Sequence, residues 1–128
     1  MDPSPLVMDE IDAGAEFVRA LHGRQPVTAA FWLKASDEGV RYLYVVLTGL
    51  ADADFGDAYL DVRAVAEALP DHYIDPFRVR LIGPDDPLAR AALDVYRRHP
   101  RRVPPRFGGS VFGGTPVDEL YLYPPPRP

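Results

Sequence analysis

Two neighbouring segments, Val27–Lys34 (VTAAFWLK) and Val40–Thr48 (VRYLYVVLT), decide the fold of this chain. Both are rich in β-branched and aromatic residues, which favour strands, and the turn segment Ala35–Gly39 separates them. We therefore predict a β-hairpin. The second strand is apolar on both faces apart from Arg41 and Thr48, which predicts a central position in the sheet.

Helices are predicted on either side of this hairpin, because apolar residues recur there at helical spacing. The first covers about Leu6–His22. The second covers about 55–69, with Asp54 as its N-cap. The third begins at Pro87 after the N-cap Asp86 and ends near His99.

A third strand is predicted over Phe77–Ile82, where apolar and basic residues alternate. This alternation predicts that Phe77, Val79 and Leu81 point into the core and that Arg78 and Arg80 point outward.

The last part of the chain predicts a second hairpin, Phe107–Phe112 and Val117–Tyr123, around Gly113-Gly114. A pair of glycines accepts the positive φ angles of a tight two-residue turn. The predicted order is α-β-β-α-β-α-β-β. The class is therefore α+β, most simply a mostly antiparallel five-stranded sheet with helices packed on it.

Length and composition favour one globular domain over residues 1–128, with loose proline-rich ends at 1–5 and 124–128. Apolar residues make up 47% and charged residues 26%, which is ordinary for a folded protein. The chain has no cysteine, which excludes disulfides, thiolate nucleophiles and thiolate metal sites.

The expected location is the cytoplasm. The opening MDPSPLVMDEID carries acids where a signal peptide needs basic residues, and no apolar stretch follows it. The longest apolar runs, such as Leu43–Leu47, are far too short to span a bilayer, so no membrane association is predicted.

Basic residues are concentrated late in the chain. Residues 1–75 carry a net charge of −9 and residues 76–128 carry +4. Guanidinium groups bind phosphates and carboxylates through planar two-point hydrogen bonds, so an anion or nucleic-acid contact is one hypothesis. The alternative is that the first two arginines compensate the third helix's dipole while the rest are solvated or pair with the acidic half. The residues concerned are Arg97, Arg98, Arg101, Arg102 and Arg106.

Aromatic residues are frequent in the predicted strands. Most are expected in the core or in cross-strand pairs. If one face of the sheet is uncovered, its tyrosines would provide a surface for a partner or for self-association, because they combine apolar area with a polar tip. The candidate interface residues are Trp32, Tyr42, Tyr44, Tyr121 and Tyr123.

Catalytic and metal-binding patterns give no positive signal. His22, His72 and His99 lie on different elements without ligand spacing, so no metal site is predicted. Asp118 and Glu119 are neighbours on a strand and point to opposite faces, so they cannot easily share a proton. No catalytic residue and no cofactor is predicted, and an enzyme acting on a small molecule is the weakest hypothesis.

Four stretches together resemble a widespread family of small uncharacterised bacterial proteins: PVTAAFWLKASDEGVRYLYVVLTGLAD, FGDAYLDVRAVAEAL, IDPFRVRLIGPDDPLARAA and GGSVFGGTPVDELYLY. That family has a "VTAAFWLY…WRLVIAS" hairpin, a "VSPNDPLV" turn and a closing "NVINGVYIEDAYIYR" hairpin. Here Gly113-Gly114 replaces its Asn-Gly, and Pro124 replaces its closing basic residue. The resemblance implies a stand-alone domain and no catalytic residue.

Three hypotheses of function follow. The first is a non-enzymatic protein-interaction or assembly module that binds a protein partner or itself as a homo-oligomer, through a sheet edge or the tyrosine-bearing face. The second is nucleic-acid or phosphate-ligand binding through 97–106, against which the net charge of −5 argues. The third is the enzyme.

Overall fold

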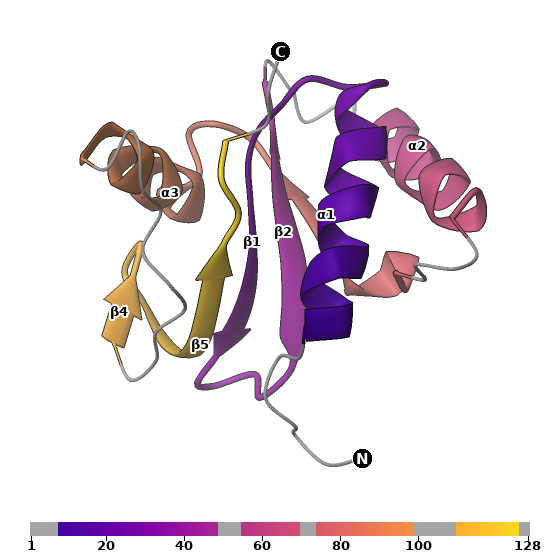
Figure 1. Ribbon diagram of the computed structural model, residues 1–128. Helices are drawn as coiled ribbons and strands as arrows, with labels where there is room; N and C mark the ends of the chain where they lie inside the picture. The colour runs from indigo at the N-terminus through magenta and orange to yellow at the C-terminus, as the bar shows by residue number, and fades with distance from the viewer. Residues whose placement is uncertain (1–7, 49–54, 70–73, 99–109, 126–128) are drawn as a thin grey trace.

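The chain forms a five-stranded sheet with helices on both faces (Figure 1). A computed structural model describes residues 8–48, 55–69, 74–98 and 110–125. The predicted α+β class and the order of its elements are confirmed. The elements are α1 (Met8–His22), β1 (Val27–Ala35), β2 (Arg41–Leu47), α2 (Phe55–Glu67), the 3-10 helix η2 (Pro76–Arg78), β3 (Val79–Ile82), α3 (Pro87–Arg98), β4 (Ser110–Phe112) and β5 (Thr115–Leu122).

The strand order in the sheet is β3-β2-β1-β5-β4. Strand β1 pairs antiparallel with both β2 and β5, and β5 pairs antiparallel with β4, whereas β2 and β3 are parallel. The sheet is therefore mostly antiparallel, as predicted. The predicted hairpin is β1–β2, and β2 lies inside the sheet between β3 and β1, as its two apolar faces predict. The middle strand of the five is β1, because β5 returns from the last part of the chain to its other edge.

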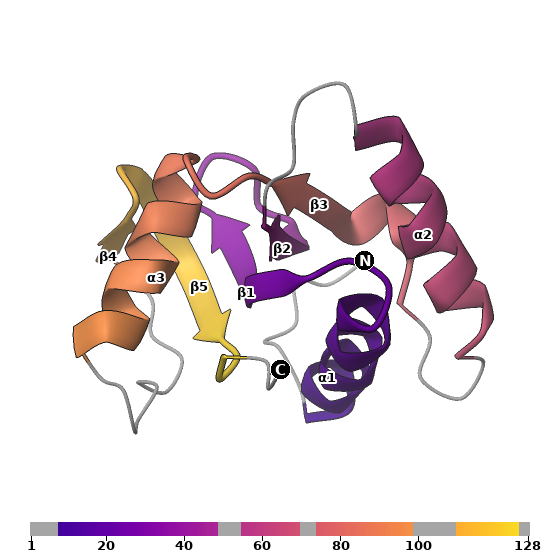
Figure 2. The ribbon, with the colours of Figure 1, turned by 90° about the horizontal axis from the view of Figure 1, so that it is seen from above.

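The two faces of the sheet carry separate apolar cores. Figure 2 shows α1 and α2 on one side of the sheet and α3 on the other. Strand β1 supplies both cores by alternation: Trp32 packs under α1, while Phe31 and Leu33 pack on the side of α3. Strand β2 does the same with Leu43 and Val45 on the first side, and with Tyr44 and Val46 on the second.

Side chains near the helix ends satisfy backbone groups. The amide of Leu88 donates to Oδ1 of Asp86 over 2.9 Å, which confirms the predicted N-cap of α3. At the end of α1, Nδ1 of His22 accepts from the amide of Val27 over 2.9 Å. Asp54, the predicted N-cap of α2, lies outside the described residues, as do His72 and His99.

The prediction that Phe77 points into the core is wrong, because its side chain is 90% exposed. Asp75 and Pro76 start a 3-10 turn here, and Oδ1 of Asp75 accepts from the amide of Phe77 over 3.0 Å. This local hydrogen bond competes with the sheet ladder, so the strand begins only at Val79. The inward positions of Val79 and Leu81 are confirmed.

On the outer edge of β3, the N–H groups of Val79 and Leu81 both donate hydrogen bonds within the chain. The amide of Val79 donates to the carbonyl of Pro76, and the amide of Leu81 donates to the hydroxyl of Tyr59 over 3.0 Å. Tyr59 comes from α2, which lies beside β3 in Figure 2. A second chain pairing at this edge would have to displace both contacts, so β3 is protected from edge-to-edge association.

The turn between β4 and β5 has the predicted glycine geometry. Gly113 and Gly114 have φ of 58° and 82°, as a type I′ turn requires. A Cβ on Gly113 would lie 2.8 Å from the carbonyl oxygen of Pro87. The hairpin therefore packs directly on the first turn of α3. Of the predicted strand before it, residues 107–109 lie outside the described residues.

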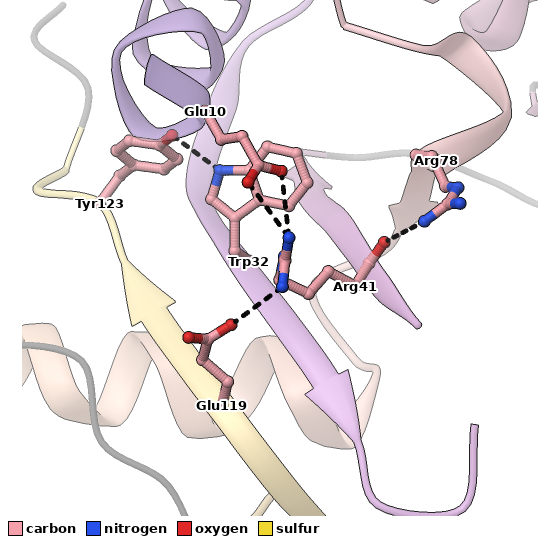
Figure 3. Close-up of polar contacts among 6 residues, drawn as sticks. All are labelled: Glu10, Trp32, Arg41, Arg78, Glu119 and Tyr123. Atoms are coloured by element: carbon pink, nitrogen blue, oxygen red, sulfur yellow. Dashed lines mark hydrogen bonds and ion pairs between the residues drawn. The ribbon is translucent and has the colours of Figure 1, made fainter. Parts of the chain in front are cut away.

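Tyr123, just after β5, joins three elements of the fold. Its hydroxyl donates to the carbonyl of Ile11 in α1 over 2.6 Å and accepts from Nε1 of Trp32 over 2.9 Å (Figure 3). Its amide donates to the carbonyl of Ala30 over 3.0 Å. On the other face of the sheet, the hydroxyl of Tyr96 in α3 donates to its carbonyl over 2.6 Å.

Gly14 makes room for the hydroxyl of Tyr123. A Cβ at this position of α1 would lie 2.1 Å from the hydroxyl oxygen and 2.9 Å from Nε1 of Trp32. The glycine is therefore required by a close approach, although glycine weakens a helix interior by about 1 kcal/mol relative to alanine.

We expect Gly14→Ala to lower the free energy of unfolding by about 2 kcal/mol or more, measured by urea denaturation. Overpacking costs about 1–3 kcal/mol, and displacing Tyr123 breaks buried hydrogen bonds, which together exceed the gain in helix propensity. The matched control is Gly56→Ala in α2, where a Cβ meets no atom within 4 Å. It should be neutral or stabilise by up to about 1 kcal/mol. Equal stability of the two variants would contradict this account.

Candidate functional site

The five aromatic residues predicted at an interface do not gather on one exposed face. Trp32, Tyr44 and Tyr123 are buried, with 5%, 5% and 6% of their surface exposed. Tyr42 and Tyr121 are half-buried and lie on opposite faces of the sheet. The structure thus gives three of the five to the cores, because helices pack on both faces. Half-buried Tyr42 and the hydroxyl of buried Tyr44 take part in the candidate surface described below.

The described part of the arginine segment pairs within its own helix. Arg97 Nη2 lies 2.5 Å from Oδ1 of Asp94, and Arg98 Nε lies 3.1 Å from Oδ2 of the same carboxylate. The hydrogen bond from Arg97 lowers the pKa of Asp94 below its usual value. Both guanidinium groups stay exposed at the last turn of α3. Arg101, Arg102 and Arg106 lie outside the described residues.

A charged row crosses the sheet on the α1 side (Figure 3). Arg41 Nη2 donates to the two carboxylate oxygens of Glu10 over 3.1 and 3.4 Å, and Arg41 Nη1 lies 3.6 Å from Oε1 of Glu119. Lys34 is in register with both Arg41 and Glu119. The side chains of Arg41 and Glu119 are only 16% and 17% exposed. This cluster therefore joins the start of α1 to β2 and β5, and its charged groups face one another.

Asp118 and Glu119 contact different partners, as their positions on a strand predict. Oδ1 of Asp118 accepts from the hydroxyl of Ser36 over 2.8 Å, whereas Glu119 faces Arg41. The two carboxylates do not form an acid–base pair.

A second cluster lies on the α3 side of the sheet, where Arg80 of β3 reaches across β2. Its guanidinium carbon lies 3.6 Å from the ring centre of Tyr42, and its Nη1 donates to the hydroxyl of Tyr44 over 2.8 Å. Both nitrogens also donate to Glu38, Nη1 to Oε1 over 3.1 Å and Nη2 to Oε2 over 2.9 Å. We call these four residues, Glu38, Tyr42, Tyr44 and Arg80, the tyrosine–arginine face.

Sheet register and a short turn build the tyrosine–arginine face. The parallel pairing sets Arg80 opposite Tyr44, and the β1–β2 turn carries Glu38 above them. Gly39 closes this turn with φ of 69°. Below, the ring of Tyr44 stacks on Phe31 with 5.3 Å between ring centres. Arg80 thus donates to a hydroxyl whose ring is held in place by Phe31, while its guanidinium lies over the ring of Tyr42.

The environment stabilises the charge of Arg80 and keeps Tyr44 neutral. The hydrogen bond to Glu38 raises the pKa of Arg80 above its usual value. Burial raises the pKa of the Tyr44 hydroxyl, although Arg80 opposes this shift. A permanently charged guanidinium beside a neutral phenol presents donors that are fixed in direction, which suits recognition of an acceptor better than proton transfer.

The tyrosine–arginine face lies on the half of the sheet away from α3. In Figure 2, α3 lies near β5 and β4, and β3 is at the other end of the sheet. None of the described helices covers β3 on this face. The side chains of Arg80 and Glu38 are accordingly 37% and 35% exposed.

The interface residues predicted from the sequence included Tyr42 and Tyr44 but not Glu38 or Arg80. Alternation along β3 correctly placed Arg80 on the opposite face from Val79 and Leu81. The sequence does not state the register between β2 and β3, and only this register brings Arg80 to the tyrosines. Glu38 gave no signal beyond being a polar turn residue.

Among the described residues, no group of three His, Asp or Glu side chains is placed to hold a metal ion. No helix within the described ranges is long and apolar enough to cross a membrane. No protein-family model, curated protein or solved structure matches this chain.

We expect Tyr123→Phe to flatten the loss of stability at high pH. Burial raises the pKa of Tyr123 above 10, so the unfolded chain releases this proton first. The resulting stabilisation is complete below about pH 10 and is lost as the pH rises further. Urea denaturation between pH 8 and 11 should show the variant weaker by about 1–3 kcal/mol at pH 8 and closer to the parent at pH 11. Parallel pH profiles would contradict the assignment.

Proposed function

We propose that this protein is a non-enzymatic interaction module that binds another protein chain through the tyrosine–arginine face. The observation that carries the proposal is the guanidinium of Arg80, stacked 3.6 Å from the ring centre of half-buried Tyr42 where none of the described helices covers the sheet. The partner is a different protein or a second copy in a homo-oligomer. The proposal includes a cytoplasmic location and needs no cofactor.

The residue types on this face suit protein recognition. Tyrosine and arginine are enriched among the residues that dominate binding energy at protein interfaces. Here their side chains are already ordered, Arg80 by Tyr42, Tyr44 and Glu38, and Tyr44 by Phe31. Because little side-chain freedom remains to be lost on binding, more of the contact energy contributes to affinity.

Nucleic-acid binding through residues 97–106 has less support. Arg97 and Arg98 share the carboxylate of Asp94, which offsets part of their positive charge. The other three arginines of the segment lie outside the described residues. The tyrosine–arginine face combines an ordered cation with aromatic area, so we rank it first.

We expect Arg80→Ala to weaken partner capture at least tenfold, because interface arginines of this kind contribute about 2 kcal/mol or more. The assay compares tagged parent and variant proteins in affinity capture from host lysate, with sedimentation velocity to detect self-association. The matched control is Arg63→Ala, which removes an exposed arginine from α2 that pairs with Glu67.

The control should capture as much partner as the parent protein. Thermal melting of each variant establishes that it is folded before capture is compared. Equal capture by Arg80→Ala and the parent, or a parent protein that stays monomeric and captures nothing, would contradict the proposed function.

A further inference from the structure

We propose that Arg80 receives a carboxylate from an acidic segment of the partner chain, and that Glu38 occupies this position in the free protein. This inference rests on the proposed function and specifies the partner's chemistry. Glu38 is then an internal substitute for the ligand, and binding exchanges one carboxylate for another on the same guanidinium.

The geometry defines a carboxylate position on Arg80. Glu38 uses both oxygens, each accepting from a different terminal nitrogen, over 3.1 and 2.9 Å. This is the two-point arrangement in which arginine recognises carboxylates. The other contacts of the guanidinium, to the ring of Tyr42 and the hydroxyl of Tyr44, do not involve Glu38. They can hold Arg80 in place while the carboxylate is exchanged.

Glu38 is the most readily displaced member of the face. It lies in the turn between β1 and β2, and its side chain is 35% exposed. Because the pair lies at the surface, water and other carboxylates compete for the guanidinium. The contrast is Arg41 on the other face, whose side chain is 16% exposed and which Glu10 and Glu119 flank. Replacing the carboxylate that pairs with Arg80 therefore leaves the core intact, whereas replacing the carboxylates that pair with Arg41 would disturb it.

The local charge favours a carboxylate over a phosphate. Asp37 adjoins Glu38 in the turn, and Asp86 lies close enough to raise the pKa of Tyr44. A partner carboxylate that displaces Glu38 adds one negative charge to this region, because Glu38 itself stays in the turn. A doubly charged phosphate adds two, on a protein whose net charge is already −5, so the carboxylate is repelled less.

The half-buried surfaces of Tyr42 and Ile82 beside Arg80 add an apolar component. An acidic residue next to an apolar one in the partner would place its carboxylate on Arg80 and its neighbour on this surface. The partner segment is therefore expected to combine both residue types.

The test uses the full chain and a capped peptide, Ala-Glu-Val-Glu-Ala, at low salt. Binding is followed by NMR through the Nε–H signals of the arginines and the backbone amides. Glu38→Gln should bind the peptide at least fivefold more tightly than the parent, because the competing internal carboxylate is gone. The largest shifts should fall on Arg80, Tyr42 and Tyr44. The double variant Glu38→Gln with Arg80→Lys should lose this gain, because lysine keeps the charge but not the two-point contact.

The matched control is Asp37→Asn, which removes the same unit of charge from the same turn. It should change the affinity by less than twofold. An equal gain in Asp37→Asn and Glu38→Gln would mean that net charge alone acts, and would overturn the proposal. Equal binding of the peptide Ala-Gln-Val-Gln-Ala, or tighter binding of inorganic phosphate at Arg80, would also overturn it.

The two proposals can fail separately. If partner capture depends on Arg80 but Glu38→Gln does not tighten peptide binding, the interaction face stands and the carboxylate exchange is wrong. If Glu38→Gln tightens peptide binding at Arg80 but Arg80→Ala leaves partner capture unchanged, the exchange stands and the proposed function is wrong.

Discussion

The hydrogen bonds of Tyr123 are the constraint on which the rest of the structure depends. The residue binds β1 through its backbone amide, α1 through its hydroxyl and α3 through its carbonyl, so one position connects the sheet to helices on both faces. Buried polar groups are costly unless they are paired, so these contacts specify one arrangement of elements where apolar packing alone would allow several. These contacts require glycine at position 14 of α1, because a side chain there would occupy the space that the Tyr123 hydroxyl fills.

The described helices cover the two faces of the sheet differently, and the proposed partner surface lies on the second face for this reason. On the first face, α1 and α2 together bury the side chains of β1, β2 and β3. The ion pairs of Arg41 with Glu10 and Glu119 lie on the same face and join α1 to β2 and β5. On the second, α3 is the helix among the described residues, and it packs on β1 and lies near β5 and β4. Of the described side chains beyond it, near β3, Tyr42 and Arg80 have polar tips that tolerate water.

Local sequence patterns predicted the helices, strands and turns, whereas the tyrosine–arginine face depends on contacts between residues distant in sequence. The β1–β2 hairpin, the cap at Asp86 and the turn at Gly113-Gly114 depend on a few adjacent residues, and the sequence revealed each of them. The inward position predicted for Phe77 was wrong, because its amide donates to Oδ1 of Asp75 in a local turn that prevails over strand alternation. The contacts of Arg80 with Tyr42 and Tyr44 depend on the register between strands that are distant in sequence, which no local pattern encodes.

The position of β5 between β1 and β4 also has a consequence for synthesis on the ribosome. Trp32 and Tyr123, which bond to each other, are 91 residues apart. At about 5–20 residues per second, translation needs on the order of 5–20 s to supply the second after the first. During that interval β1 and β2 are both made, but the edge of β1 that β5 later occupies has no partner strand. An unpaired strand edge favours misassociation, so the strand that becomes the centre of the sheet needs protection until β5 is made.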